Sequence, residues 1–136
     1  MARDAFHDAV RHALEKEGWR ITDDPYFLAF GLDVMAVDLA ADRTIAAERG
    51  EERIAVEIKS FSNPSLLHDF HAALGQYLNY RLAIKRTDPT RKLYLAIPVN
   101  AHARFLERDL ARASLEAYEV SMLVYNAAEE VILEWN

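Results

Sequence analysis

The sequence predicts a single α/β domain in which helices flank a central β-sheet. The chain has 136 residues, of which 51% are hydrophobic and 28% are charged, as is typical of one globular domain with a substantial core. Stretches with apolar residues at helical spacing alternate with stretches that have the two-residue period of strands. One of these, residues 32–40, is apolar on both faces, as expected for a strand in the interior of a sheet.

The two longest helical patterns have recognisable ends. The first, residues 5–17, stops at Gly18, a residue that commonly ends a helix. The second, residues 65–85, follows Ser62-Asn63-Pro64, in which a capping residue precedes a proline suited to a first helical turn. The other expected elements are a strand at 19–22, a strand or loop at 26–30, strands at 32–40, 44–49 and 53–59 with a turn at 50–52, a strand at 92–99, a helix at 100–113, and strands at 120–125 and 131–135.

The strand that contains Glu57 and Lys59 is the first candidate for a functional site. Ile54, Val56 and Ile58 share its apolar face, so Glu57 and Lys59 lie side by side on the other face. A carboxylate can bind a hard cation such as Mg2+, and a neighbouring lysine can sit near an attacking water or a phosphate oxygen. A lone Glu-x-Lys on a half-buried strand is also compatible with an ordinary solvated pair. Other parts of the chain must therefore distinguish a functional pair from a solvated one.

Acidic residues before this strand could complete such a site. Asp38 ends the apolar stretch 32–40, and a carboxylate in that setting needs hydrogen-bond partners or a metal. A functional role and a capping role for Asp38 remain equally open. Asp42 is the alternative acid, and Glu48 is a reserve metal ligand.

Polar residues on the predicted helices are harder to assign. Gln76 and Tyr80 lie at positions i and i+4 and therefore share one face of the long helix. Such residues are usually an exposed amide and a half-buried ring, but here they follow the Glu57 strand by one helix. His7 and His102, on the first and last predicted helices, are expected at the surface.

The net charge of −6 disfavours a general nucleic-acid binder, but the charge is unevenly distributed. Seven acids and two bases follow residue 106, so this end could face water or a basic partner. The end of the long helix and the start of the next strand could instead face phosphate, although a solvated helix end explains the cluster equally well. Its bases, against the single acid Asp88, are Arg81, Lys85, Arg86, Arg91 and Lys92.

We expect a cytoplasmic protein without disulfides or membrane contacts. The sequence has no cysteine, which excludes thiolate metal sites. Its first residues lack the basic-then-apolar pattern of a signal peptide, and no apolar run approaches the ~20 residues of a membrane span. The sequence leaves open whether the chain forms a homo-oligomer.

Taken in order, Asp38, Glu57-x-Lys59 and Gln76-x-x-x-Tyr80 resemble the motifs of the PD-(D/E)XK nuclease superfamily. The resemblance implies a restriction-endonuclease-like fold, with a central mixed β-sheet flanked by helices. It also implies that Asp38 and Glu57 bind Mg2+, or Mn2+, and that Lys59 positions or activates water. Gln76 and Tyr80, a pair similar to that of RecB-type nucleases, would hydrogen-bond the phosphate or orient Lys59.

DNA is the partner that this resemblance implies. Lys59, at the predicted metal site, and Arg81 and Lys85, on the following helix, are the expected DNA contacts.

A narrower resemblance extends over nearly the full length, and the chain is similar to the XisH family. Members of this family are fdxN-element excision controlling factors of cyanobacteria. The resemblance implies a role in programmed DNA excision during heterocyst development, together with a site-specific recombinase and a companion protein, XisI. The segments that carry it are Phe6-His7-Asp8-Ala9-Val10, Gly18-Trp19-Arg20-Ile21-Thr22, Val37-Asp38-Leu39-Ala40-Ala41 and the stretch from Ile54 to Phe61.

Three functions are compatible with these observations. The first is a controlling factor for DNA excision that has a nuclease-like fold and a magnesium site, and this is the interpretation we favour. The second is an active metal-dependent DNA endonuclease. The third is a structural domain in which Glu57 and Lys59 form a surface pair that contributes well under ~1 kcal/mol to stability.

Overall fold

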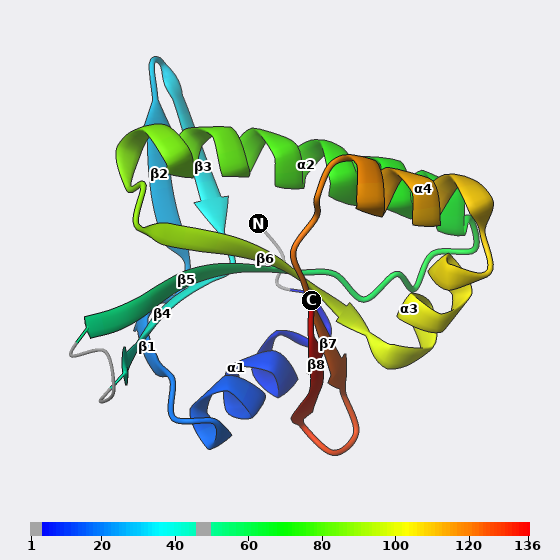
Figure 1. Ribbon diagram of the computed structural model, residues 1–136, viewed down its shortest axis with the longest axis horizontal. Helices are drawn as coiled ribbons and strands as arrows, with labels where there is room; N and C mark the ends of the chain where they lie inside the picture. Colours follow the sequence, from blue (N-terminus) through cyan, green and yellow to red (C-terminus); the bar gives the residue numbers. More distant parts are fainter. Residues whose placement is uncertain (1–3, 46–49) are drawn as a thin grey trace.

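The computed structural model describes residues 4–45 and 50–136, and its centre is a six-stranded mixed sheet (Figure 1). The strand order is β1-β4-β5-β6-β7-β8, and β2 and β3 form a separate two-stranded sheet. The β5–β6 and β6–β7 pairs are parallel, whereas β1–β4, β4–β5 and β7–β8 are antiparallel. The elements are α1 (His7–Lys16), β1 (Arg20–Asp23), β2 (Tyr26–Phe30), β3 (Asp33–Val37), β4 (Leu39–Ile45), β5 (Gly50–Ile58), α2 (Leu66–Thr87), β6 (Arg91–Pro98), α3 (Val99–Leu106), α4 (Asp109–Ala117), β7 (Met122–Asn126) and β8 (Val131–Trp135).

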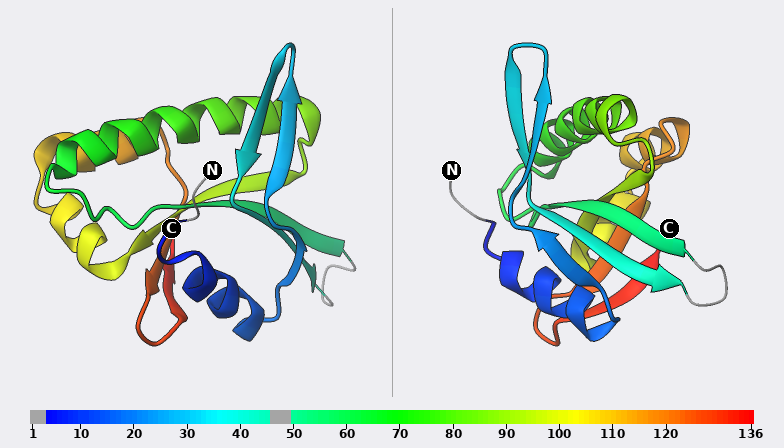
Figure 2. Two further views of the ribbon diagram at one scale, coloured as in Figure 1. Left: turned by 180° about the vertical axis from the view of Figure 1, so that it is seen from behind. Right: turned by 90° about the vertical axis from the view of Figure 1, so that its left-hand side faces the viewer.

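Helices cover both faces of the sheet. In Figures 1 and 2, α1 lies on one side, and α2, α3 and α4 lie on the other. Strand β5 shows why: Ile54, Val56 and Ile58 belong to the core on the α1 side, while Ala55 belongs to the core beneath α2. The expected alternation is therefore confirmed, and so is the α/β architecture with a mixed sheet flanked by helices.

The stretch 32–40 is not one strand, and this prediction was wrong. The chain runs as β3 to Val37, leaves the β2–β3 hairpin at Asp38, and enters the main sheet as β4 at Leu39. Figure 2 shows the hairpin projecting from the sheet beside the C-terminal end of α2. Apolar residues on both faces suit either sheet, so the pattern could not reveal where the chain changes from one to the other.

Three other boundaries also differ from the prediction. Residues 50–52 are the start of β5, paired with the end of β4, and not a turn. The cap of α2 is Ser65, whose hydroxyl accepts a hydrogen bond from the His68 backbone N–H at 3.2 Å, and not the Ser62 segment. The helix expected at 100–113 is two helices, α3 and α4, and Leu106 and Leu110 beside the break are about half exposed.

The histidines expected at the surface are buried. His7 is 3% exposed, and its Nε2 lies 2.8 Å from Asp24 Oδ1. Asp24 also accepts a hydrogen bond from Arg11 at 2.6 Å, which ties the start of α1 to the β1–β2 connection. His102 is buried on α3. Contacts so distant in sequence leave no signal in the local pattern.

None of the helices in residues 4–45 and 50–136 combines the length and apolarity needed to cross a bilayer.

Candidate functional site

The pairing of β4 with β5 brings Asp38 to Glu57. Leu39 lies opposite Val56, so Asp38, one residue earlier, reaches the level of Glu57. The Asp38 backbone N–H donates to Glu57 Oε1 at 3.3 Å, and the Ile58 backbone N–H donates to Asp38 Oδ2 at 2.7 Å. We call Asp38 and Glu57 the carboxylate pair.

Glu57 is buried, although it was expected on a half-buried strand. Its exposed fraction is 5%, because the α2 side of β5 is covered. Burial, the charge of Asp38 and a hydrogen bond between the two carboxyl groups raise the pKa of Glu57 to about 8, and the Lys59 ammonium only partly opposes this. At pH 7 the carboxylate pair therefore holds a proton, unless a cation takes its place.

Lys59 lies beside the carboxylate pair. Its Nζ is 3.5 Å from Glu57 Oε2, and the side chain is about one-quarter exposed. The Lys59 backbone N–H donates to the Ala96 carbonyl at 3.2 Å, so the strand geometry continues past Ile58 and keeps the two side chains on one face. The ammonium therefore faces both the buried carboxyl group and solvent.

Helix α2 supplies the opposite wall of the site. Tyr80 is half-buried, and its pKa is raised by burial and by the nearby charges of Glu57 and Asp38. Gln76 lies one turn earlier on the same face of the helix and is exposed. Tyr80 thus lies near the carboxylate pair, whereas Gln76 shares only its helix face and is exposed to solvent.

A cavity of about 210 Å³ opens beside Lys59, and it includes two acids that the sequence analysis did not assign to a site. Asp4 Oδ2 accepts a hydrogen bond from the Ser60 backbone N–H at 2.9 Å. Asp69, on α2, accepts hydrogen bonds from Asn63. Neither acid belongs to a local motif, so only the fold could bring them to Lys59.

The other predicted site residues lie elsewhere or outside the described residues. Asp42 Oδ1 contacts the guanidinium of Arg91 at 3.2 Å and is therefore committed to a separate ion-pair cluster. Arg81 and Lys85 line a different cavity. Glu48 lies outside the described residues.

The carboxylate pair supplies oxygen ligands of the kind that Mg2+ and Mn2+ prefer. In residues 4–45 and 50–136, no group of three or more His, Asp or Glu side chains gathers around one point. Two carboxylates fit Mg2+, which usually keeps several waters and binds through one or two carboxylates together with substrate phosphates. The raised pKa of Glu57 supports the fit, because a divalent cation would balance the two charges that the pair cannot otherwise carry together.

Comparison with known proteins identifies the family. The sequence profile described as XisH protein matches residues 1–133. An XisH family protein from Nostoc punctiforme PCC 73102 is 42% identical with a TM-score of 0.87, over 97% of this chain and 98% of that one. A protein from Anabaena variabilis described as a fdxN element excision controlling factor is 41% identical with a TM-score of 0.88, over 98% of each chain. No curated protein matches the chain. The chain therefore belongs to the XisH family.

Proposed function

We propose that this protein is a controlling factor for site-specific DNA excision and that its carboxylate pair binds a divalent cation. The similar protein from Anabaena variabilis, described as an excision controlling factor, supports the first part. The observation that carries the second part is the contact of the partly buried Asp38 with the buried Glu57, beside which Lys59 Nζ lies at 3.5 Å. This arrangement supports the restriction-endonuclease-like fold that the motif order implies.

The residues around the pair suit a DNA phosphodiester group. A divalent cation held by Asp38 and Glu57 would offset the charge of the phosphate. The Lys59 ammonium, on the solvent side of Glu57, would hydrogen-bond a phosphate oxygen or orient a water. Tyr80 carries a hydroxyl that can donate to the phosphate, since its raised pKa keeps it protonated. Gln76 would contact the same backbone from the rim.

A recombinase and XisI are the protein partners that we propose with this function. A controlling factor would act on the recombinase reaction and not replace it. The acidic C-terminal region, with seven acids and two bases after residue 106, could then meet a basic partner.

Hydrolysis of the bound phosphodiester is the second candidate function, and the position of Lys59 favours it. A buried carboxylate next to a lysine and a tyrosine hydroxyl supplies a metal ligand, a group that can position water, and a phosphate contact.

One pair of assays tests both functions with the same variants. We expect Glu57→Gln to abolish excision in a reconstituted reaction with recombinase, XisI and Mg2+, because the amide cannot supply the charge that the cation needs. If the protein also cuts DNA, nicking of supercoiled plasmid in Mn2+ should fall by about 10³-fold or more, as for loss of a group essential to catalysis.

The matched control is Glu51→Gln, which changes an exposed glutamate on the same strand. Full excision by Glu57→Gln would contradict a role of the carboxylate pair in excision control. Equal nicking by wild type and Glu57→Gln would exclude the endonuclease.

A further inference from the structure

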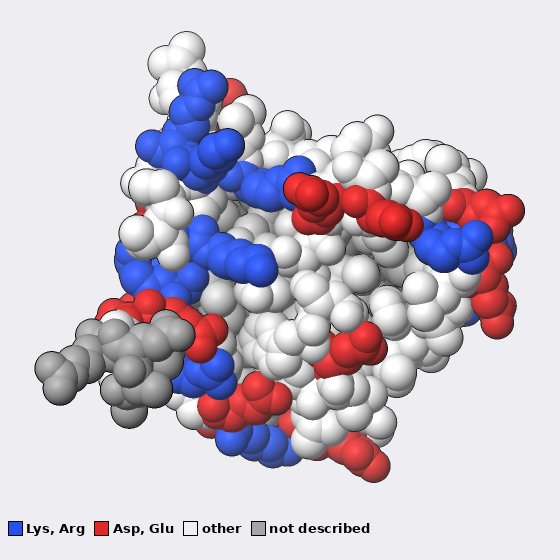
Figure 3. Space-filling model, in the orientation of Figure 1, with Lys and Arg blue, Asp and Glu red and all other residues white. Residues whose placement is uncertain are grey.

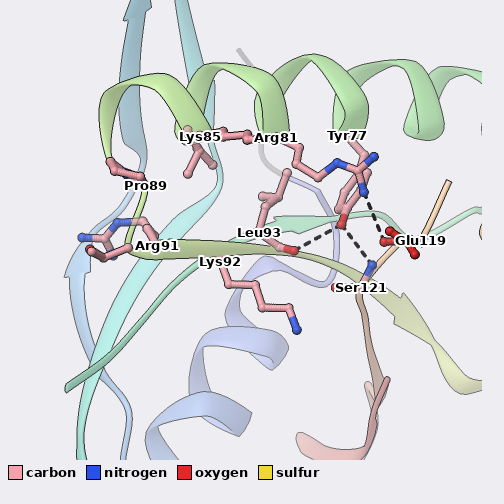
Figure 4. Close-up of a pocket in the computed structure, with 11 residues that line it drawn as sticks. Tyr77, Arg81, Lys85, Pro89, Arg91, Lys92, Leu93, Glu119 and Ser121 are labelled. Carbon is pink, nitrogen blue, oxygen red and sulfur yellow. Dashed lines mark hydrogen bonds between the residues drawn. The ribbon is translucent and has the colours of Figure 1, made fainter. Parts of the chain in front are cut away.

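We propose that a second site, a basic cavity between α2 and β6 that is separate from the carboxylate pair, binds the sugar–phosphate backbone of double-stranded DNA. The cavity has a volume of about 300 Å³, and it lies between α2, the start of β6 and the segment before β7 (Figure 4). The proposal rests on the proposed function in one respect, since it takes DNA as the relevant polyanion. We call the site the basic cavity, and the cations that face it are Arg81, Lys85 and Arg91. Lys92 borders the cavity, but its side chain points to the α1 side of the sheet, where its Nζ lies 5.0 Å from the centre of the Tyr94 ring (Figure 4).

The wall of the basic cavity on α2 is a stripe of residues one turn apart, Tyr77, Arg81 and Lys85. Tyr77 is buried and fixes this stripe to the sheet: its hydroxyl donates to the Leu93 carbonyl at 3.3 Å and accepts from the Ser121 backbone N–H at 3.0 Å. Figure 4 shows both hydrogen bonds at the back of the cavity. The cations therefore project from a rigid base.

Arg81 is held in place by the same base. Its guanidinium carbon lies 5.3 Å from the centre of the Tyr77 ring, and its Nη1 donates to the carbonyls of Tyr118 at 2.8 Å and Glu119 at 3.1 Å. Carbonyl groups orient the guanidinium without neutralising it, so the full positive charge remains at the cavity.

Two of the three cations are not paired with an acid. Within the described parts of the chain, no carboxylate lies at ion-pair distance from Arg81 or Lys85, whereas Arg91 is neutralised by Asp88 at 2.9 Å and Asp42 at 3.2 Å. Glu119 also lines the cavity, but it is exposed, and it is its backbone carbonyl that accepts from Arg81. Figure 3 shows Lys and Arg gathered on this side of the molecule, over the C-terminal half of α2 and the start of β6. A protein of net charge −6 thus presents a local surplus of positive charge.

The chemistry of the basic cavity favours phosphate over an acidic protein. Thr90 and Ser121 place polar groups beside the cations, and DNA backbones are commonly bound by Lys and Arg together with hydroxyl and N–H donors. Among the apolar residues of the lining, Tyr77, Ile84 and Leu93 are at most 3% exposed, and Pro89 is exposed. A single exposed proline offers little of the apolar anchoring on which protein–protein interfaces usually depend.

The basic cavity and the carboxylate pair lie on different sides of α2. Tyr80 and Arg81 are consecutive, so their side chains diverge by about 100° around the helix. Tyr80 faces the charges of Glu57 and Asp38, whereas Arg81 faces the carbonyls that follow α4. DNA bound at the basic cavity would therefore be held through one part of its backbone, and a different part would reach the carboxylate pair.

The test is binding of a short DNA duplex, followed by fluorescence anisotropy over a series of salt concentrations. With two unpaired cations, we expect the plot of log affinity against log salt to include a contribution of about −2 to its slope from this site. The double variant Arg81→Gln/Lys85→Ala should bind about 10- to 100-fold more weakly near 0.1 M salt and reduce the steepness of the slope by about 2. Lys85 is exposed, and the amide of glutamine can still donate to the carbonyls that Arg81 contacts, so the fold should be retained.

Two controls separate this proposal from others. The double variant Arg104→Ala/Arg108→Ala removes two exposed positive charges near the α3–α4 turn, and it should bind DNA as wild type does. Glu57→Gln should keep the salt-dependent binding, so loss of the cation site and loss of the basic cavity are distinguishable. Wild-type affinity and slope in Arg81→Gln/Lys85→Ala, an equal loss in the control pair, or binding of polyglutamate without binding of DNA would each overturn the proposal.

Discussion

Replacement of Arg91 by methionine is expected to lower the free energy of unfolding by about 3–5 kcal/mol, the usual result of removing one partner from a buried ion pair. Arg91 is 7% exposed, and its guanidinium donates to Asp88, Asp42 and the Ile54 carbonyl at 2.9–3.2 Å. The Tyr26 ring covers it at 4.9 Å. Methionine would fill much of the volume of the arginine side chain. It would leave the carboxylates of Asp88 and Asp42 without the positive charge of the guanidinium. Urea denaturation at pH 7 measures the difference.

The adjacent residue supplies the matched control for this experiment. Lys92 is exposed, and Lys92→Met should change stability by less than about 0.5 kcal/mol. A loss below ~1 kcal/mol in Arg91→Met would show that Arg53, which donates to Asp88 Oδ1 at 2.8 Å, already balances the cluster.

The second large effect is expected in the pH dependence of stability. The folded protein raises the pKa of Glu57 from 4.5 to about 8, so it holds a proton that the unfolded chain releases at lower pH. The contribution of this proton to stability is complete below pH 4.5 and is lost as pH rises to about 8, because the unfolded state then binds fewer protons than the folded state. Relative to Glu57→Gln, wild type should lose on the order of 3 kcal/mol between pH 5 and pH 8.

Glutamine suits this comparison because it keeps an oxygen that can accept from the Asp38 backbone N–H and gains a donor toward the Asp38 carboxylate. The charged or titratable groups that face Glu57 are Asp38, Lys59 and Tyr80, and they remain in the variant. Subtracting the two stability curves, measured without divalent cations, cancels the contributions of the groups that wild type and variant share. Parallel curves would mean that Glu57 ionises normally, and Glu51→Gln should run parallel to wild type.

The site could be predicted from the sequence only where its geometry is local. The spacing of Glu57 and Lys59 placed both on one face of a strand, and the spacing of Gln76 and Tyr80 placed both on one face of a helix. The contact of Asp38 with Glu57 depends on the register of β4 against β5, which no local pattern specifies. The residue pattern alone therefore did not decide whether Asp38 or Asp42 is the acid that lies beside Glu57.

The charge of the long helix illustrates the same limit. The resemblance to nucleases grouped Lys59, Arg81 and Lys85 as expected DNA contacts. In the structure, Lys59 lies beside Glu57, whereas Arg81 and Lys85 line another cavity. Arg81 follows Tyr80 on α2, and consecutive residues of a helix point in directions about 100° apart. The burial of His7 similarly depends on Asp24, a contact made across the β1–β2 connection.

The central claim is that the carboxylate pair exchanges its proton for a divalent cation. Calorimetric titration with Mg2+ or Mn2+ at pH 7, in buffers of different ionisation enthalpy, measures both binding and proton release. We predict that wild type binds one ion with release of about one proton and that Glu57→Gln binds none. Binding without proton release, or binding retained by Glu57→Gln, would contradict the claim.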